Sequence, residues 1–284
     1  MEVDPQYRYL NGKVNGVHTG VALAGCESII LADDDIRYTR HDINRICELL
    51  ERYEMVRPQN YLSPLPWWAR MEAARMLINR GVLRTGDYPG TCGFRRSTML
   101  RVGHYDGDVL FDNEEIVRHF ILEGASVCHA NDFFILKHPP TLAKWREQRP
   151  RQAYEDFVMR AKTLAFMAVL PVAVFVALAG GAAALCAYGL AVAAAAMILA
   201  ERGRRGAARK FFPALITLHA PLWMLERSAS VYWALYWRVF HGGYPFGDKL
   251  LSKGTGTAWV PGGRLSSRGL TYGAPASAHP HERR

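Results

Sequence analysis

The sequence is poor in cysteine, and its cysteines do not occur in pairs. Cys26, Cys47, Cys92, Cys128 and Cys186 are odd in number, widely spaced and free of any C-x-x-C motif. A zinc site needs closely spaced ligands and a disulfide framework needs an even set, so the pattern argues against both. A reducing, cytosolic location suits such cysteines.

Charge is missing from one long stretch. Residues 163–200 contain no Asp, Glu, Lys, Arg or His. A run of this length exceeds a soluble core helix and reaches the length of a membrane span. It also lies too far from the N-terminus to be a signal peptide. Because Gly180 and Gly181 interrupt the run, we predict a hairpin of two transmembrane helices over 161–200, with both ends on the same side.

Basic residues gather at the two ends of this run. The 284-residue chain has a formal net charge of +9. Arg160 and Lys162 precede the run, and residues 201–210 (ERGRRGAARK) carry five basic residues against one acidic. This asymmetry is typical of the cytosolic flank of a membrane element.

The basic residues form no stripe interleaved with aromatics, so we expect no nucleic-acid partner. We expect a multi-pass protein of the cell membrane with a cytosolic polar domain.

Strand and helix patterns alternate through the polar residues 1–160. Strands are predicted over 28–32, 54–58 and 126–130, and helices over 67–81 and 111–125. Thr39 is expected to cap a further helix that carries Ile43, Ile46, Cys47 and Leu50 on one face. The alternation favours an α/β sheet covered by helices on both faces. In such sheets, ligands bind at the carboxyl ends of the strands.

The region after the uncharged run has a different composition. Residues 211–240 are apolar and rich in Trp and Tyr, but Glu226 and Arg227 divide them. A third, imperfect span and helices lying in the membrane interface both fit this pattern, so residues 201–250 are expected to form a basic loop followed by such a segment. The tail over 251–284 is expected to be disordered, because from about residue 254 it is rich in Gly, Ser, Pro and Ala.

An acidic triplet follows the first predicted strand. In Asp33-Asp34-Asp35, alternation turns the outer two carboxylates to the same side. Two such carboxylates can hold Mg²⁺ or Mn²⁺, with phosphate oxygens completing the coordination shell. A solvated turn or a helix cap is the alternative explanation for the triplet.

Four segments, in order, resemble the family 2 glycosyltransferases. GKVNGVHTGVALAGCESIILADDDIRYT (12–39) resembles the G-K, small-residue helix and strand ending in D-x-D of that family. GTCGFRRS (90–97) resembles its acceptor-side loop, FDNEE (111–115) its acidic base motif, and QRPRQAYEDF (148–157) its Q-x-x-R-W segment. The resemblance covers about residues 12–160 and implies a GT-A, Rossmann-like domain. Membrane helices follow this domain in the processive and ceramide-glucosyltransferase-like members.

The resemblance implies roles for individual residues. Asp33 and Asp35 would bind Mg²⁺ or Mn²⁺ at the diphosphate of a nucleotide sugar, and Lys13 would lie toward that diphosphate. Gln148 and Arg151 match the Q and R of Q-x-x-R-W and would contact the departing diphosphate or the acceptor. The alternative for these two is a solvated basic face near the membrane. Gln152 stands where the family has Trp.

The catalytic base is expected in the FDNEE motif. Transfer with inversion needs a carboxylate that accepts the proton of the acceptor hydroxyl. Aligning the motif with the family places Asn113 at an acidic position, and an amide cannot act as a base. Asp112 is therefore the first candidate and Glu115 the second. Acidic residues at a helix N-terminus also complement the helix dipole, which is the alternative role.

The start of the chain bears on the activity. In the family, two strands with nucleotide-binding loops open the domain, and here only residues 1–11 precede Gly12-Lys13. We therefore expect residues 1–160 to form an incomplete GT-A domain, and we expect the 284-residue chain by itself to bind nucleotide sugars weakly or not at all and to transfer none. The sequence predicts a membrane-bound enzyme that moves a sugar from a nucleotide sugar to a lipid or glycan acceptor at the membrane. A truncated, inactive membrane scaffold derived from such an enzyme is the alternative.

Overall fold

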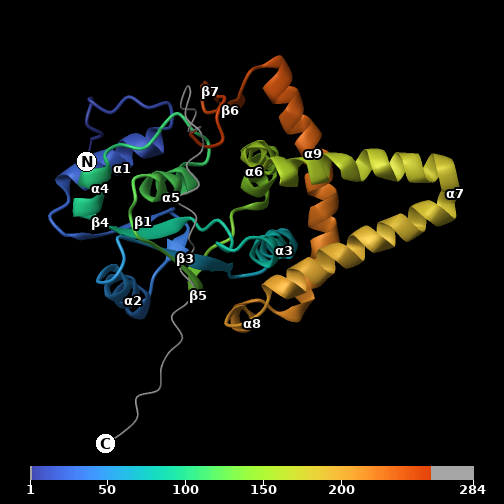
Figure 1. The fold of residues 1–284 in the computed structure, drawn as a ribbon, viewed down its shortest axis with the longest axis horizontal. Coiled ribbons are helices and arrows are strands. Elements are labelled where there is room, and N and C mark those ends of the chain that lie inside the picture. The colour runs from blue at the N-terminus through green and yellow to red at the C-terminus, as the bar shows by residue number, and fades with distance from the viewer. Residues whose placement is uncertain (1, 257–284) are drawn as a thin grey trace, which may run out of the picture.

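A computed structural model describes residues 2–256, with a sheet-containing part on one side and a group of helices on the other (Figure 1). The sheet part is built from α1 (Gly12–Leu23), β1 (Ser28–Ala32), β2 (Ile36–Arg37), α2 (Arg40–Leu50), β3 (Met55–Leu62), β4 (Thr91–Arg95), α4 (Arg96–Val102), α5 (Asp112–Leu122) and β5 (Val127–Lys137). The helical part is built from α3 (Trp67–Val82), α6 (Leu142–Glu155), η1 (Asp156–Val158), α7 (Arg160–Gly203), α8 (Ala208–Phe211), η2 (Ala214–His219) and α9 (Ala220–Phe240). A small hairpin of β6 (Tyr244–Phe246) and β7 (Lys249–Leu251) follows α9.

The sheet is mixed, with the strand order β1-β4-β3-β5-β2. Strand β4 is antiparallel to both of its neighbours, β1 and β3, whereas β3 and β5 are parallel. Strands β1, β3 and β5 therefore run in the same direction and end at the same edge. The short β2 pairs antiparallel with the end of β5. The α/β class predicted from the sequence is confirmed at this level.

Helices cover both faces of the sheet, as predicted. On one face, α1, α4 and α5 pack against apolar strand residues such as Met55 and Phe94, which are fully buried. On the other face, α2 packs against Val56 through Ile46. Successive strand residues point to opposite faces, which explains why Met55 and Val56 lie in different clusters.

The predicted Thr39 cap of α2 is present. The Thr39 hydroxyl accepts a hydrogen bond from the Asp42 backbone N–H at 3.2 Å, and the Asp42 carboxylate accepts one from the Thr39 backbone N–H at 2.8 Å. Of the four apolar residues expected on the inner face, Ile46 and Leu50 are buried, but Ile43 is exposed.

Three strand predictions need correction. Strands β3 and β5 extend well beyond the predicted 54–58 and 126–130, because a change of register between Pro58 and Gln59 lets the pairing continue past a polar interruption. Strand β4 was expected to be part of a loop. Its Gly93 faces α2, and a Cβ there would lie 2.4 Å from Ile46 Cγ2, so the glycine permits close packing rather than a turn.

Helix α7 is a hairpin. It bends at Gly181, whose φ of 69° lies in the left-handed region that favours glycine, and its two arms project away from the rest of the chain (Figure 1). Among residues 2–256, α7 is the one helix long and apolar enough to cross a membrane. Its buried residues lie toward its two ends, and the middle of each arm is exposed. The predicted helical break at Gly180-Gly181 is therefore present.

The base of the hairpin packs closely against α3. A Cβ on Gly203 would lie 1.8 Å from the Leu77 carbonyl oxygen, and one on Gly81 would lie 2.2 Å from the Leu199 carbonyl oxygen. The two helices therefore touch backbone to backbone at their glycines. This contact attaches the returning arm of α7 to the polar part of the chain.

The segment after β7 is ordered up to residue 256, which corrects the disorder expected from residue 251. Leu251 is fully buried, and Lys253 and Gly254 accept hydrogen bonds from the backbone N–H groups of Leu110 and Phe111 at 3.0 and 2.9 Å. The rest of that prediction, 257–284, lies outside the described residues. The strands β6 and β7 within 201–250 were not predicted.

The glycine contact at the hairpin base yields a first prediction. We expect Gly203→Ala to destabilise the chain by about 1–3 kcal/mol, because the new methyl group overlaps the Leu77 carbonyl. Gly189→Ala in the same helix is the control, since nothing lies within 4 Å of a Cβ there. Thermal unfolding in detergent micelles compares the two. Equal midpoints would show that α3 and α7 do not pack in this way.

Candidate functional site

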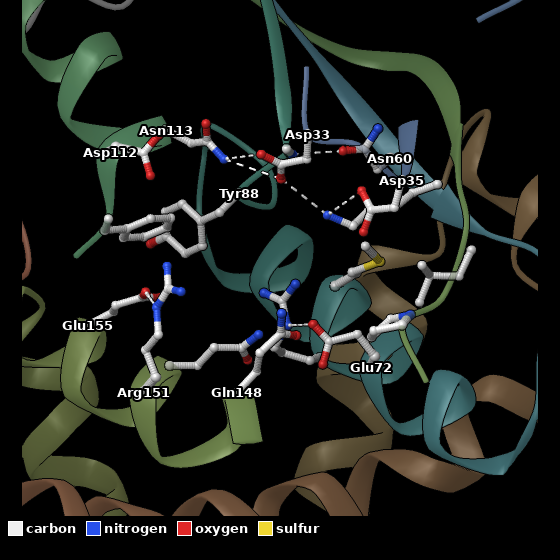
Figure 2. A pocket seen from close by; sticks show the side chains of 18 of the residues that line it. Asp33, Asp35, Asn60, Glu72, Tyr88, Asp112, Asn113, Gln148, Arg151 and Glu155 are labelled. Carbon is white, nitrogen blue, oxygen red and sulfur yellow. Dashed lines mark hydrogen bonds and ion pairs between the residues drawn. The ribbon is translucent and has the colours of Figure 1, made fainter. Parts of the chain in front are cut away.

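A cavity lies where the carboxyl ends of β1, β3 and β5 face helix α6 (Figure 2). Asp33 follows β1, Asn60 lies near the end of β3, and Lys137 is the last residue of β5. On the opposite wall, Gln148 and Arg151 extend from α6 toward these residues. The cavity therefore occupies the edge of the sheet at which α/β proteins bind ligands.

The acidic triplet contributes two of its three carboxylates to the cavity. Asp33 and Asp35 line it, whereas Asp34 is exposed and lies outside it. The predicted alternation is confirmed in this respect. The turn is held at its start by the Asp33 backbone N–H, which donates to the Gly90 carbonyl at 2.8 Å.

One ammonium group links two of the predicted site residues. Lys13 Nζ lies 2.7 Å from Asp33 Oδ1 and 2.9 Å from Asp112 Oδ2. Burial disfavours the charge of Lys13, but Asp112 and Asp33 outweigh it and raise the lysine pKa. For Asp33, burial acts against ionisation, while Lys13 and Lys137 outweigh it and lower the pKa. Lys13 itself does not line the cavity, but it contacts two aspartates that do.

A second lysine, Lys137, lies between the two aspartates of the triplet. Its Nζ is 3.4 Å from Asp33 Oδ2 and 3.3 Å from Asp35 Oδ1. Burial raises the pKa of Asp35, and Lys137 only partly opposes this effect. The sequence analysis missed Lys137 because the predicted strand stopped at residue 130. The apolar run FFILK (133–137), which ends in this lysine, is the signal that marks the true end of β5.

The residues at the triplet fit a divalent cation. Mg²⁺ and Mn²⁺ prefer carboxylate oxygens and complete their shell with water or phosphate oxygens. Asp35 Oδ1 is buried and accepts no hydrogen bond, since Lys137 approaches it at ion-pair distance without hydrogen-bond geometry. Among the described residues, no group of three or more His, Cys, Asp or Glu side chains gathers around one point. Asp33 and Asp35 are therefore the two carboxylates that would bind such a cation. The cation would displace Lys137 from them.

Helix α6 presents a polar face to the cavity. Gln148, Arg151, Gln152 and Glu155 follow the spacing i, i+3, i+4 and i+7, and all four line it. Arg151 donates to Glu155 Oε1 at 2.9 Å and to the Leu110 carbonyl at 3.1 Å. Burial raises the pKa of Glu155, with Arg151 opposing the shift. This spacing was the available sign of a helix that the sequence analysis did not predict.

Gln152 has a structural partner outside α6. Its Oε1 accepts a hydrogen bond from Arg227 of α9 at 3.3 Å. Gln152 therefore joins the cavity wall to helix α9.

The two candidate bases are placed differently. Asp112 is the first residue of α5, lines the cavity and is almost fully buried. Glu115 does not line the cavity. Its carboxylate pairs with Arg118 at 2.6 Å and accepts the Gly256 backbone N–H at 2.7 Å. The structure thus keeps Asp112 as a candidate and removes Glu115, because the segment after β7 occupies the space around Glu115. Asp112 also lies in the first turn of α5, where a carboxylate complements the helix dipole, so its position fits this alternative role as well.

Other cavity residues form a buried charge network that sequence reasoning missed. Glu72 pairs with Arg75 at 2.8 Å and with Arg149 at 2.6 Å. Arg75 also pairs with Asp87 at 2.8 Å. Burial opposes ionisation of Glu72, but Arg149 and Arg75 outweigh it and hold the glutamate pKa well below its usual range. Glu72 and Arg75 are an i,i+3 pair within α3, but Arg149 comes from α6 and Asp87 follows α3, so no local sequence pattern indicates the whole network.

The shared ammonium of Lys13 yields a second prediction. We expect Lys13→Met to destabilise the chain by about 1–3 kcal/mol, because it leaves the buried Asp112 without its cation. Lys13→Arg, which keeps the charge, should cost less. In Lys13→Met combined with Asp112→Asn, the cost should be smaller than the sum of the single costs. Urea unfolding in detergent micelles measures all four variants, and strict additivity would contradict the ion pair.

Comparison with known proteins does not place the chain in a family. No protein-family model and no curated protein sequence matches it. Its function is therefore inferred from its own side chains, from their arrangement around the cavity, and from the resemblance carried by its short motifs.

Proposed function

We propose that the chain is a membrane-bound glycosyltransferase that moves a sugar from a nucleotide sugar to a lipid or glycan acceptor, with inversion. One observation carries the proposal. Five residues from three separate motifs, Asp33, Asp35, Asp112, Gln148 and Arg151, line one cavity. These motifs are far apart in the sequence. If each resembled the family only by chance, their residues would not be expected to line the same cavity. The sheet edge at which they meet is also consistent with a GT-A-type domain.

The donor diphosphate fits between the two walls of the cavity. Arg151 supplies a planar guanidinium that matches phosphate oxygens, and Gln148 offers amide donors beside it. Opposite them, Asp33 and Asp35 would hold Mg²⁺ or Mn²⁺. When bound, such a cation stabilises the negative charge on the leaving diphosphate. Lys13 keeps Asp33 ionised and in position.

Asp112 is the residue we assign as the general base. Its carboxylate accepts the proton of the acceptor hydroxyl while the hydroxyl oxygen forms a bond to the anomeric carbon. The bond between that carbon and the diphosphate oxygen breaks, and the electron pair leaves with the nucleoside diphosphate. Attack from the side opposite the leaving group inverts the anomeric carbon. The buried setting of Asp112, with Lys13 at 2.9 Å, favours a fixed orientation of the carboxylate.

The α7 hairpin is the membrane anchor in this proposal. Each arm has about twenty residues and reaches about 30 Å, the thickness of the hydrocarbon core. With basic residues at both ends of the hairpin, two crossings would leave the cavity on the cytosolic side. A soluble nucleotide sugar and a membrane-held acceptor meet there.

The inactive scaffold remains the alternative, and one observation favours it. Asp33 is already paired with Lys13 and Lys137, so its charge is balanced without a metal. A scaffold predicts no transfer from any nucleotide sugar.

The third prediction separates these functions. The purified chain in lipid nanodiscs is incubated with radiolabelled UDP-, GDP- and dTDP-sugars, Mn²⁺ and a membrane lipid extract. The proposed function predicts metal-dependent transfer to lipid and its loss in Asp35→Asn. Asp34→Asn is the matched control, because Asp34 belongs to the same triplet but is exposed outside the cavity. Transfer that is equal in Asp35→Asn and the parent would refute the assigned site, and its absence from the parent would favour the scaffold.

The fourth prediction concerns Lys137. Because its ammonium lies between Asp33 and Asp35, it competes with a divalent cation for the same carboxylates. Lys137→Met should therefore bind Mn²⁺ about fivefold more tightly, the effect of losing roughly 1 kcal/mol of competition. Electron paramagnetic resonance of free Mn²⁺ gives the affinity. Lys144→Met removes a lysine of the exposed α6 surface and should change nothing. An unchanged affinity in Lys137→Met would place any bound metal elsewhere.

A further inference from the structure

Helix α9 has one exposed and mostly apolar face along its length, with the half-buried Glu226 at its edge. Leu222, Leu225, Trp233, Tyr236 and Phe240 are exposed at fractions of 41–73%. Together with Ala229, they recur every three or four residues, which is the spacing of one helix face. Leu215 and Leu218 of η2, also exposed, continue the same face toward the N-terminus. An apolar face this long is not expected to remain in water.

The opposite face of α9 is bound to the polar part of the chain. Trp223, Arg227, Val231 and Ala234 are buried. Arg227 pairs with Asp156, at the end of α6, at 3.1 Å and donates to Gln152 of α6 at 3.3 Å. Helix α9 therefore packs against the end of α6, which carries charged and amide groups, and it cannot separate from α6 without exposing a buried guanidinium.

These contacts exclude a third membrane crossing by α9. A crossing would place Arg227, Asp156 and the polar helix α6 inside the hydrocarbon, where unshielded polar groups are costly. Helix α9 also runs across the base of the α7 hairpin rather than alongside its arms (Figure 1). If the arms of α7 enter the bilayer along its normal, α9 lies in the plane of the membrane surface.

The surroundings of α9 suit an anionic lipid surface. Arg202, Arg205, Arg209 and Lys210, between the hairpin and η2, are exposed. Arg238 is exposed near the end of α9. Such residues attract anionic headgroups near the membrane surface. Trp233 and Tyr236 lie stacked on the exposed face, with ring centroids 5.3 Å apart. Trp and Tyr are the side chains that membrane interfaces favour.

We propose that η2 and α9 form an interfacial helix that lies in the plane of the membrane surface, with its exposed face among the upper acyl chains of an anionic leaflet. The inner face of α9 then forms part of the cavity wall. Arg227 lines an inner cavity together with Arg75, Tyr88, Phe111, Gln152 and Glu155. All of these except Arg227 also line the cavity described above. The site is thereby held at the level of the lipid headgroups.

The inference rests on the membrane anchoring in the proposed function and is independent of sugar transfer. A chain without transfer activity would still place α9 at the interface. Conversely, an α9 that stays in water would leave the cavity chemistry untouched. The two failures are therefore distinguishable, provided that the test measures position in the bilayer rather than activity.

Spin labels on single cysteines measure this position. A variant without native cysteines, shown to unfold at the parent's temperature, receives one label at Leu222, Leu225, Tyr236 or Phe240. Labels at Leu164 and Phe175, both exposed on the first arm of α7, provide the internal depth scale. Vesicles of phosphatidylcholine and phosphatidylglycerol hold the protein. Collision with oxygen, which enters lipid, and with a nickel chelate, which stays in water, reports the depth of each label.

We expect the α9 labels to share one shallow depth, whereas Phe175 lies much deeper than Leu164. A depth that rises and then falls from residue 222 to residue 240 would mean that α9 crosses the membrane. Labels that collide with the nickel chelate as strongly as a label on a water-exposed residue would mean that the face remains in water. Dipolar broadening between labels, without lipid contact, would mean that a second copy covers it. Each of these three results would overturn the proposal.

Discussion

The ammonium group of Lys13 is the contact on which the candidate site depends. It joins Asp33, at the end of β1, to Asp112, at the start of α5, although these residues are far apart in the sequence. Asn11 sets the position of Lys13. The Asn11 side chain caps α1 by accepting a hydrogen bond from the Lys13 backbone N–H, and it donates one to the Val109 carbonyl, which precedes α5. Without a cation between them, two carboxylates in this partly buried place would repel each other. The Lys13 side chain thus allows Asp33 and Asp112 to lie together in the wall of the cavity.

A second group of charges connects the site to helices α7 and α9. Asp156, at the end of α6, pairs with Lys162 at the start of α7 at 2.8 Å and with Arg227 of α9 at 3.1 Å. Buried ion pairs add little net stability, but they allow only a few geometries. The same residues that form the inner cavity therefore fix how the hairpin and α9 are attached. Gly203 and Leu77 complete the attachment by direct backbone contact between α7 and α3.

Several sequence predictions failed where distant contacts overrode local pattern. Gly93 suggested a loop, but its missing side chain makes room for Ile46 in a strand. Glu115 suggested a base, but Arg118 and the Gly256 backbone bind it outside the cavity. The composition after residue 250 suggested disorder, yet residues 251–256 complete the packing beside α5 and α6. In each case the decisive partner lies in another element, so residue type alone carries no information about it.

The sequence by itself determined the features that follow from short-range periodicity. These are the α/β alternation, the break of the apolar run at Gly180-Gly181, the Thr39 cap and the common side of Asp33 and Asp35. Each depends on residues within a few positions of one another, where helix and strand geometry sets direction. Only the tertiary structure decided that Lys137 lies between the two aspartates and that α6 faces them. It also decided that Arg227 of α9 contacts Gln152 and Asp156 at the end of α6. Those arrangements depend on which elements pack together, and a local pattern is compatible with many packings.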